Sequence, residues 1–189
     1  MAQKRKDWNG LISGFKASDL VFLDESGCNT DMTRRYAYSL GGSRAVDSAP
    51  LSKPKNTTIL SSIQLDGTLR YTTFSGGTTV ERFKRYLETD LLPHLNGNSV
   101  LIMDNMKSHH AKAVRNLLDS SGVRYIYLPP YSPDLNPIEK LWSKVKAFLR
   151  KFKARTLDAL PNAIQCAFQT VSPSDCSGWF RSCGYSPYF

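Results

Sequence analysis

Two short runs of almost purely apolar residues, each closed by an aspartate, constrain the fold of this chain most strongly. The first is Asp19-Leu-Val-Phe-Leu-Asp24 and the second is Ser99-Val-Leu-Ile-Met-Asp104. Runs of this length and composition are typical of strands buried inside a sheet. If the two strands are adjacent and parallel, their carboxyl ends meet at one sheet edge, the usual ligand position in α/β folds. This arrangement places Asp24 and Asp104 side by side.

The rest of the sequence predicts a mixed α/β architecture. Antiparallel strands are expected where β-branched and aromatic residues cluster, with a hairpin turn at Asp66-Gly67; these segments are 36–40, 57–65 and 69–74. Helices are expected where apolar residues recur at helical spacing; these are 78–92, 111–119, 137–153 and 157–171. A strand at 123–128 follows the second helix, so residues 99–128 read as a parallel crossover unit covered on both faces.

Composition indicates one globular domain. The chain has 189 residues, of which 41% are hydrophobic and 11% aromatic, enough to form a full core. We expect a basic lead-in or linker at 1–17, the folded domain at 18–172 and a C-terminal tail at 173–189. No apolar run approaches the roughly 20 residues of a membrane span, and the four cysteines contain no CxxC pair. A cytoplasmic protein without membrane contact is expected.

The charge of the chain favours a polyanionic partner. It contains 25 Lys and Arg against 16 Asp and Glu, a formal net charge of +9. Such an excess binds nucleic acid by neutralising phosphates and releasing counterions. A basic surface that is only solvated remains the alternative.

A third acid, Glu139, lies at the start of the helix expected from Pro137. Asn136 is expected to cap that helix, with Pro137 and Glu139 at its first and third positions. The buried stripe of the helix comprises Ile138, Leu141, Trp142, Val145, Phe148, Leu149 and Phe152. Trp142 is therefore interpreted as a core residue rather than a platform for stacking on DNA.

Glu139 heads a different face of the same helix. At 100° per residue it is aligned with Ser143 and with three cations, Lys146, Arg150 and Lys153. These cations are candidates for following a DNA backbone away from the reaction centre. An ordinary solvated Lys/Arg face is the alternative.

Asp24, Asp104 and Glu139 together suggest a site for hard cations. Carboxylates without paired histidine or cysteine ligands suit Mg²⁺ or Mn²⁺. Two such ions catalyse phosphoryl transfer without a covalent nucleophile. Taken singly, each acid also has a structural interpretation, since an aspartate after a strand often caps a turn and an acid in a first helical turn stabilises the helix.

Three motifs carry a resemblance to a known family. They are Leu-Asp24-Glu-Ser-Gly, Met-Asp104-Asn-Met-Lys-Ser-His109 and Leu-Pro-Pro-Tyr-Ser-Pro-Asp-Leu-Asn-Pro-Ile-Glu139-Lys-Leu-Trp142. Thirty-four residues, positions 105–138, separate the second acid from the third. Over roughly residues 20–151 the chain resembles the DDE transposases of the Tc/mariner superfamily, especially their bacterial insertion-sequence branch.

The resemblance implies a ribonuclease-H-like fold with a mixed central sheet flanked by helices. It gives Asp24, Asp104 and Glu139 the catalytic and metal-binding roles, with Mg²⁺ or Mn²⁺, two ions expected, as cofactor. Asn105 and His109 match the pattern after the second aspartate, as residues that support the metal site or contact substrate. The implied activity is cleavage at transposon ends and strand transfer into target DNA, at the nucleoid of a bacterial cell.

The implied partners are double-stranded DNA, from transposon ends and target, and further protein. Members of the superfamily carry N-terminal helix-turn-helix units that read the terminal repeats, and too few residues precede Asp24 for such units. We expect a homodimer or association with an N-terminal DNA-binding half. A non-enzymatic DNA-binding partner or remnant of a transposase, and a stand-alone nuclease of the same fold, remain alternatives.

Overall fold

The computed structural model describes residues 2–34, 36–48, 50 and 54–185. Within them a single mixed sheet has the strand order β3-β2-β1-β4-β5. The strands are β1 (Leu20–Cys28), β2 (Thr57–Gln64), β3 (Leu69–Ser75), β4 (Val100–Met103) and β5 (Arg124–Tyr127). β3, β2 and β1 pair antiparallel, whereas β1, β4 and β5 pair parallel. The predicted mixed sheet is confirmed, although its third antiparallel strand is β1 itself.

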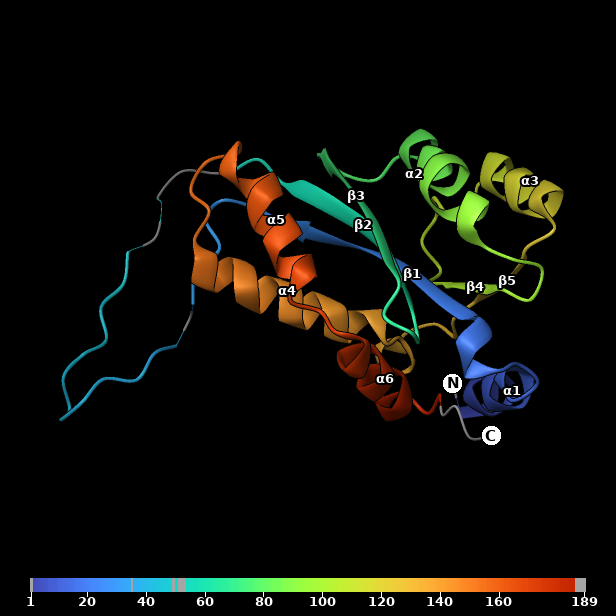
Figure 1. The fold of residues 1–189 in the computed structure, drawn as a ribbon, viewed down its shortest axis with the longest axis horizontal. Helices are drawn as coiled ribbons and strands as arrows, with labels where there is room; N and C mark the ends of the chain where they lie inside the picture. Colours follow the sequence, from blue (N-terminus) through green and yellow to red (C-terminus); the bar gives the residue numbers. More distant parts are fainter. Residues whose placement is uncertain (1, 35, 49, 51–53, 186–189) are drawn as a thin grey trace.

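Helices cover both faces of this sheet (Figure 1). They are α1 (Ala2–Ile12), α2 (Val80–Tyr86), α3 (Lys112–Ser121), α4 (Ile138–Phe152), α5 (Ala159–Gln169) and α6 (Pro173–Ser182). α2 continues through a π-helical turn, Leu87–Leu91, and a 3-10 turn, Leu92–His94. The four helices expected from apolar spacing are all present, with ends that differ by a few residues.

Alternating residues of β1 divide the core in two. Leu20 and Phe22 pack with α4, α5 and α6, whereas Val21 and Leu23 pack with α2 and α3. This alternation follows from strand geometry, because successive side chains point to opposite faces of a sheet. By the same alternation, Asp24 lies on the face of Leu20 and Phe22, and Glu25 lies on the face of Val21 and Leu23. The strand does not end at Asp24 as expected but runs on to Cys28.

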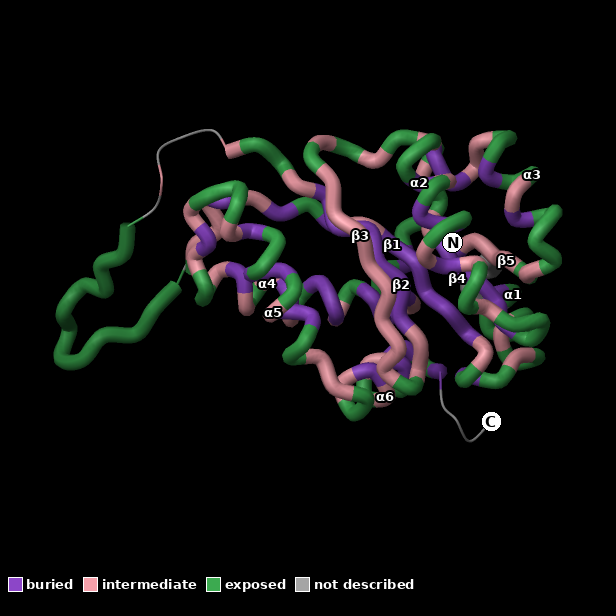
Figure 2. The backbone as a smooth tube through the Cα atoms, turned by 45° about the horizontal axis from the view of Figure 1, so that its top comes forward, coloured by how far each residue is buried: buried purple, intermediate pink, exposed green. Residues whose placement is uncertain are grey.

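The strand expected at 36–40 is wrong. Between β1 and β2 the chain leaves the sheet and forms an extended arm, residues 36–48, that projects from the body (Figure 2). Tyr36, Tyr38 and Leu40 are 90%, 106% and 94% exposed. The β-forming residues are present, but β2 pairs with β1 only from Cys28↔Thr57 onward, and no strand among the described residues pairs with the arm. β propensity needs such a neighbour to become a strand.

The two ends of the chain contribute to the core. Trp8 of α1 is buried and donates its indole N–H to the Tyr185 hydroxyl at 3.3 Å. α6 buries Cys176 and Phe180, and the Phe180 ring packs edge-on against Phe22 with centroids 5.3 Å apart. Residues 2–12 therefore form a helix, anchored to the domain by Trp8, rather than a linker. Likewise 173–182 form a helix on the sheet rather than a tail; residues 186–189 lie outside the described residues.

Candidate active site

The parallel pairing of β1 with β4 brings the two aspartates together. Leu23 is in register with Met103, so Asp24 and Asp104 follow at the same edge of the sheet. Both continue the side-chain set that faces α4. They line a cavity of about 470 Å³ together with Glu139 and the proline-rich loop 128–136. The structure thus gathers all three predicted carboxylates in one cavity.

Asp24 is the most buried of the three acids, with 8% of its surface exposed. Its Oδ1 accepts the Glu25 backbone N–H at 2.7 Å, and its Oδ2 accepts the Trp142 indole N–H at 3.1 Å. Burial raises the pKa of Asp24 to about 7, and repulsion from Asp104 and Glu139 adds to this, although the two hydrogen bonds oppose it. Burial and the two neighbouring acids thus disfavour the charged form of Asp24, and a bound cation would favour it.

Trp142 was interpreted as core, and it is buried at 3% exposure. Its polar N–H nevertheless serves the site, because it holds the carboxylate of Asp24. Buried indoles need such an acceptor. Trp142 lies one helical turn after Glu139, so α4 presents an acid and a donor to the same region.

Asp104 is anchored by its own loop and by His109. Its Oδ1 accepts the Met106 backbone N–H at 3.0 Å and lies 2.8 Å from His109 Nδ1. Burial opposes ionisation, but these two contacts keep the pKa of Asp104 below its usual value. Asp104 therefore caps a turn, as its structural interpretation predicts, and it also lines the cavity.

His109 is fully buried beneath this edge of the sheet. Its ring stacks on Phe83, with centroids 4.2 Å apart, and its Nε2 lies 3.8 Å from Glu25 Oε2. Burial lowers the pKa of His109, but the flanking carboxylates of Asp104 and Glu25 outweigh it and raise the pKa to about 9. A cationic His109 therefore lies between two acids. Alternation along β1 was the sequence signal that could have identified Glu25, which we did not single out.

The start of α4 differs from the expected cap. α4 begins at Ile138, and the Asn136 side chain makes no capping bond among the described residues. Asn136 is instead 4% exposed and lines the cavity, and no donor in the described part of the chain reaches its Oδ1. Glu139 is exposed in the first turn of α4. The side chains of Asn136 and Glu139 therefore line the cavity, and the Asn136 side chain does not cap the backbone of α4.

Asn105 has a structural partner. Its Nδ2 donates to the Leu128 carbonyl at 2.5 Å. The Leu128 backbone N–H donates to the Met103 carbonyl at 2.8 Å. These bonds hold the proline-rich loop against the end of β4, where the loop forms one wall of the cavity. Tyr131, at the rim, is 89% exposed and has a left-handed φ of 55°.

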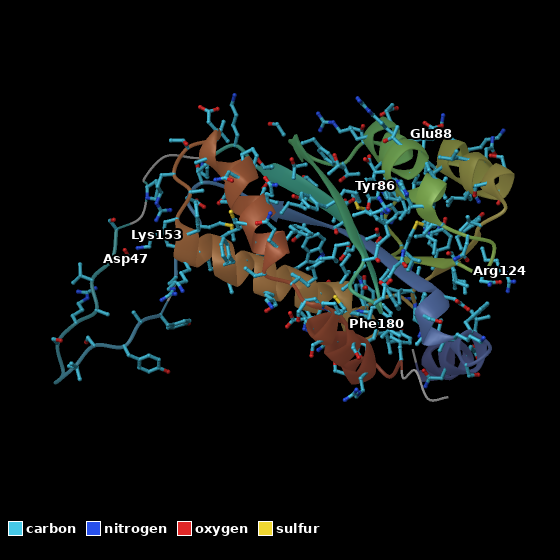
Figure 3. The ribbon with its side chains drawn as sticks, in the orientation of Figure 1. Asp47, Tyr86, Glu88, Arg124, Lys153 and Phe180 are labelled. Atoms are coloured by element: carbon cyan, nitrogen blue, oxygen red, sulfur yellow. The ribbon has the colours of Figure 1, made fainter. Side chains whose placement is uncertain are left out.

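The basic face of α4 divides into two parts. Lys146 and Arg150 line a second, polar cavity of about 440 Å³ with residues 27–33 at the end of β1. Lys153 lies elsewhere, because its ammonium group binds Asp47 of the arm at 2.5 Å and 2.7 Å (Figure 3). Of the three predicted cations, Lys146 and Arg150 thus lie beside the end of β1, the strand that contains Asp24.

The donor set fits a divalent cation chemically. Three carboxylates line one cavity, and Mg²⁺ and Mn²⁺ bind carboxylate oxygens together with water. Within the residues that the structure describes, no three acidic, histidine or cysteine side chains already form a closed metal cluster. Asp24 instead accepts a hydrogen bond from Trp142, and Asp104 pairs with His109.

Comparison with known proteins identifies the family. Residues 19–161 match the family model described as DDE superfamily endonuclease. The chain belongs to this family. The matched segment of the DDE endonuclease contains all three acids and the loop that precedes Glu139.

Relatives of this DDE endonuclease include transposases. The transposable element Tc1 transposase of Caenorhabditis elegans is 29% identical over 97 residues, which are 49% of this chain and 36% of that protein. The chain therefore matches about a third of that relative's length. The DDE superfamily that the motifs indicate is therefore confirmed by the family match over residues 19–161.

Solved structures show the same fold. A chain of the pre-cleavage Mos1 transpososome superposes with a TM-score of 0.80 at 19% identity, covering 99% of this chain and 59% of that one. The catalytic domain of Mos1 mariner transposase gives 0.66 at 17% identity, covering 98% and 87%. The predicted ribonuclease-H-like fold is confirmed. In the described part of the DDE endonuclease, no helix is both long and apolar enough to cross a bilayer.

Proposed function

We propose that this DDE endonuclease is the catalytic domain of a transposase that cuts DNA at transposon ends and joins the freed ends to target DNA. One observation carries the proposal: Asp24, Asp104 and Glu139 line one cavity in a chain matched over residues 19–161 by the family. Support for the substrate comes from the Mos1 neighbours, which were solved as a pre-cleavage transpososome and a strand transfer complex. The bacterial insertion-sequence branch and action at a bacterial nucleoid rest on the motifs.

The metal is proposed to be Mg²⁺ or Mn²⁺, as a pair of ions. Mos1 paired-end complexes have been solved with Mg and with Mn. Bound divalent cations would polarise the scissile phosphate, activate the attacking hydroxyl and stabilise the leaving oxygen. Asp24, Asp104 and Glu139 would hold them.

The remaining residues of the site orient these acids and the substrate. Trp142 fixes the plane of the Asp24 carboxylate through its indole N–H. Asn105 holds the wall of the cavity formed by the proline-rich loop. Lys146 and Arg150, at the polar cavity that continues along β1, are placed to neutralise backbone phosphates of bound DNA. Double-stranded DNA is the proposed substrate, bound by a homodimer or with an N-terminal DNA-binding half.

A joining assay tests the proposal. A labelled duplex that carries a terminal repeat from the DNA flanking the gene is incubated with the protein, a supercoiled target plasmid and Mg²⁺ or Mn²⁺. Cleaved ends and inserted products are both expected. Asp104→Asn and Glu139→Gln should each reduce them by at least about 100-fold, because a ligand of the cation is lost. Glu88→Gln, which changes an exposed acid that pairs with Lys84 on α2, is the matched control and should retain activity.

The same assay separates the alternatives. Cleaved but never inserted DNA would indicate a stand-alone nuclease. DNA binding without any cleavage would indicate a non-enzymatic partner. Cleavage that survives in Asp104→Asn or Glu139→Gln would remove the assignment of the carboxylates.

A further inference from the structure

Glu25 is a partly buried acid that the proposed chemistry does not use. It follows Asp24 directly on β1 and therefore points to the opposite face of the sheet, toward α2. Its side chain is 14% exposed, and its Oε2 has no hydrogen-bond partner within the described residues. A buried carboxylate without a compensating group is costly. The polar group that faces it is the imidazole of His109, whose Nε2 lies 3.8 Å from Oε2 and also has no hydrogen-bond partner within the described residues.

His109 is held firmly in place. Its ring stacks on Phe83, its backbone N–H donates to the Met106 carbonyl at 3.0 Å, and its carbonyl accepts the Tyr127 hydroxyl at 3.0 Å. The orientation of the ring is thereby restricted on the α2 side of the sheet. Its two nitrogens then face different acids, with Nδ1 at Asp104 Oδ1 and Nε2 at Glu25 Oε2.

The contacts of Asp104 leave one of its oxygens open. Met106 and His109 both contact Oδ1, so neither engages Oδ2. The Asp104 side chain is 45% exposed and lines the acid cavity. A carboxylate held by one oxygen presents the other in a defined direction, as supporting groups do for metal ligands.

We propose that Glu25 is a positioning residue that acts through His109 to fix the carboxylate of Asp104 for cation binding. The inference rests on the proposed function, because it concerns a cation bound by Asp104. Glu25 itself touches neither cation nor DNA in this proposal. It anchors the far side of the imidazole, so that the near side holds Asp104 Oδ1 and leaves Oδ2 for the cation.

Mn²⁺ binding by the full chain without DNA tests this inference. Free Mn²⁺ is followed by its electron paramagnetic resonance signal as each protein is titrated. Glu25→Gln, which keeps the side-chain volume and removes the charge, is expected to bind Mn²⁺ about 10-fold more weakly, the scale typical of groups that support metal ligands. Glu88→Gln should bind like the wild type. Thermal unfolding of each variant verifies that it is folded.

A double-mutant cycle separates positioning from a general electrostatic effect. If Glu25 acts through His109, then Glu25→Gln should weaken Mn²⁺ binding in the wild-type background but not further in His109→Gln. Equal losses in both backgrounds would overturn the inference, because Glu25 would then act independently of the ring. Unchanged binding by a folded Glu25→Gln would overturn it as well.

The remaining outcomes are decisive as well. If Glu25→Gln does not fold because it leaves His109 uncompensated, Glu25→Asp retains the charge but withdraws it by one methylene. Weaker Mn²⁺ binding by Glu25→Asp is expected, and wild-type binding would overturn the inference. Mn²⁺ binding that depends on Glu25 in a chain that never cleaves DNA would contradict only the proposed function. A wild-type chain that binds no Mn²⁺ would contradict both.

Discussion

Replacing Asp24 by asparagine is expected to stabilise the metal-free protein at neutral pH. The pKa of Asp24 is raised from 3.8 to about 7, chiefly by burial. Between these values the unfolded chain has lost its proton while the folded protein retains it. The stability contributed by protonated Asp24 is therefore fully present below about pH 3.8 and is lost as pH rises through about 7. Asparagine does not titrate, so Asp24→Asn avoids this loss.

The size of the effect follows from the shift. One pKa unit corresponds to about 1.4 kcal/mol. A rise of roughly three units therefore lowers the free energy of unfolding of the wild type by on the order of 4 kcal/mol between low and high pH. An asparagine can still accept the Trp142 indole N–H through its one oxygen, but it then loses the bond from the Glu25 backbone N–H, a cost that does not depend on pH. The advantage of Asp24→Asn over the wild type should therefore be small near pH 4 and largest above pH 7.

Urea unfolding monitored by circular dichroism, at pH values from about 5 to about 8 and with chelator present, measures this difference. Comparing the two proteins cancels the titration of groups they share, His109 included. Asp158→Asn, which changes an exposed acid next to α5, is the control. A stability difference that stays constant across this range would refute the argument that burial of Asp24 is costly. With Mn²⁺ present, the wild type should gain stability by mass action and Asp24→Asn should not.

Three further outcomes are expected. Mn²⁺ should quench tryptophan fluorescence in the wild type and much less in Trp142→Phe, because the Trp142 indole binds Asp24; unchanged quenching would contradict the placement of the cation. Lys146→Ala should lower the salt dependence of DNA binding by about one counterion, whereas Lys153→Ala should change it little because its ammonium group already binds Asp47; filter-binding titrations in increasing salt compare them. Ser172→Ala should cost about 1 kcal/mol of unfolding free energy, because the Ser172 hydroxyl caps α6; an equal loss in Ser172→Thr would argue against the cap.

The elements of the fold were largely predictable from the sequence. Burial imposes a period on apolar residues, and that period is written locally in the chain. This period predicts the strand that contains Asp24, the strand that ends just before Asp104, and the stripe of α4 that contains Leu141 and Val145, both fully buried. Phe152 is the exception in that stripe, since it lies at the end of α4 and is 47% exposed. Residues 36–40 have strand-forming side chains, but within the part of the chain that the structure describes no strand lies beside them, and a neighbouring strand is a tertiary property.

The sequence by itself predicts the three acids, because their places after apolar runs and at a helix start, and the spacing between them, can be read from the chain. Tertiary structure alone decided which polar groups meet around them. The Trp142 indole binds Asp24, which lies 118 positions earlier in the chain. The Lys153 ammonium group binds Asp47, which lies 106 positions earlier. Glu25 contacts His109 beneath the sheet edge. Hydrophobic periodicity records which face of an element is buried, but a hydrogen bond or ion pair needs two particular atoms within a few ångströms. That condition is met only once the sheet, α2 and α4 have packed together.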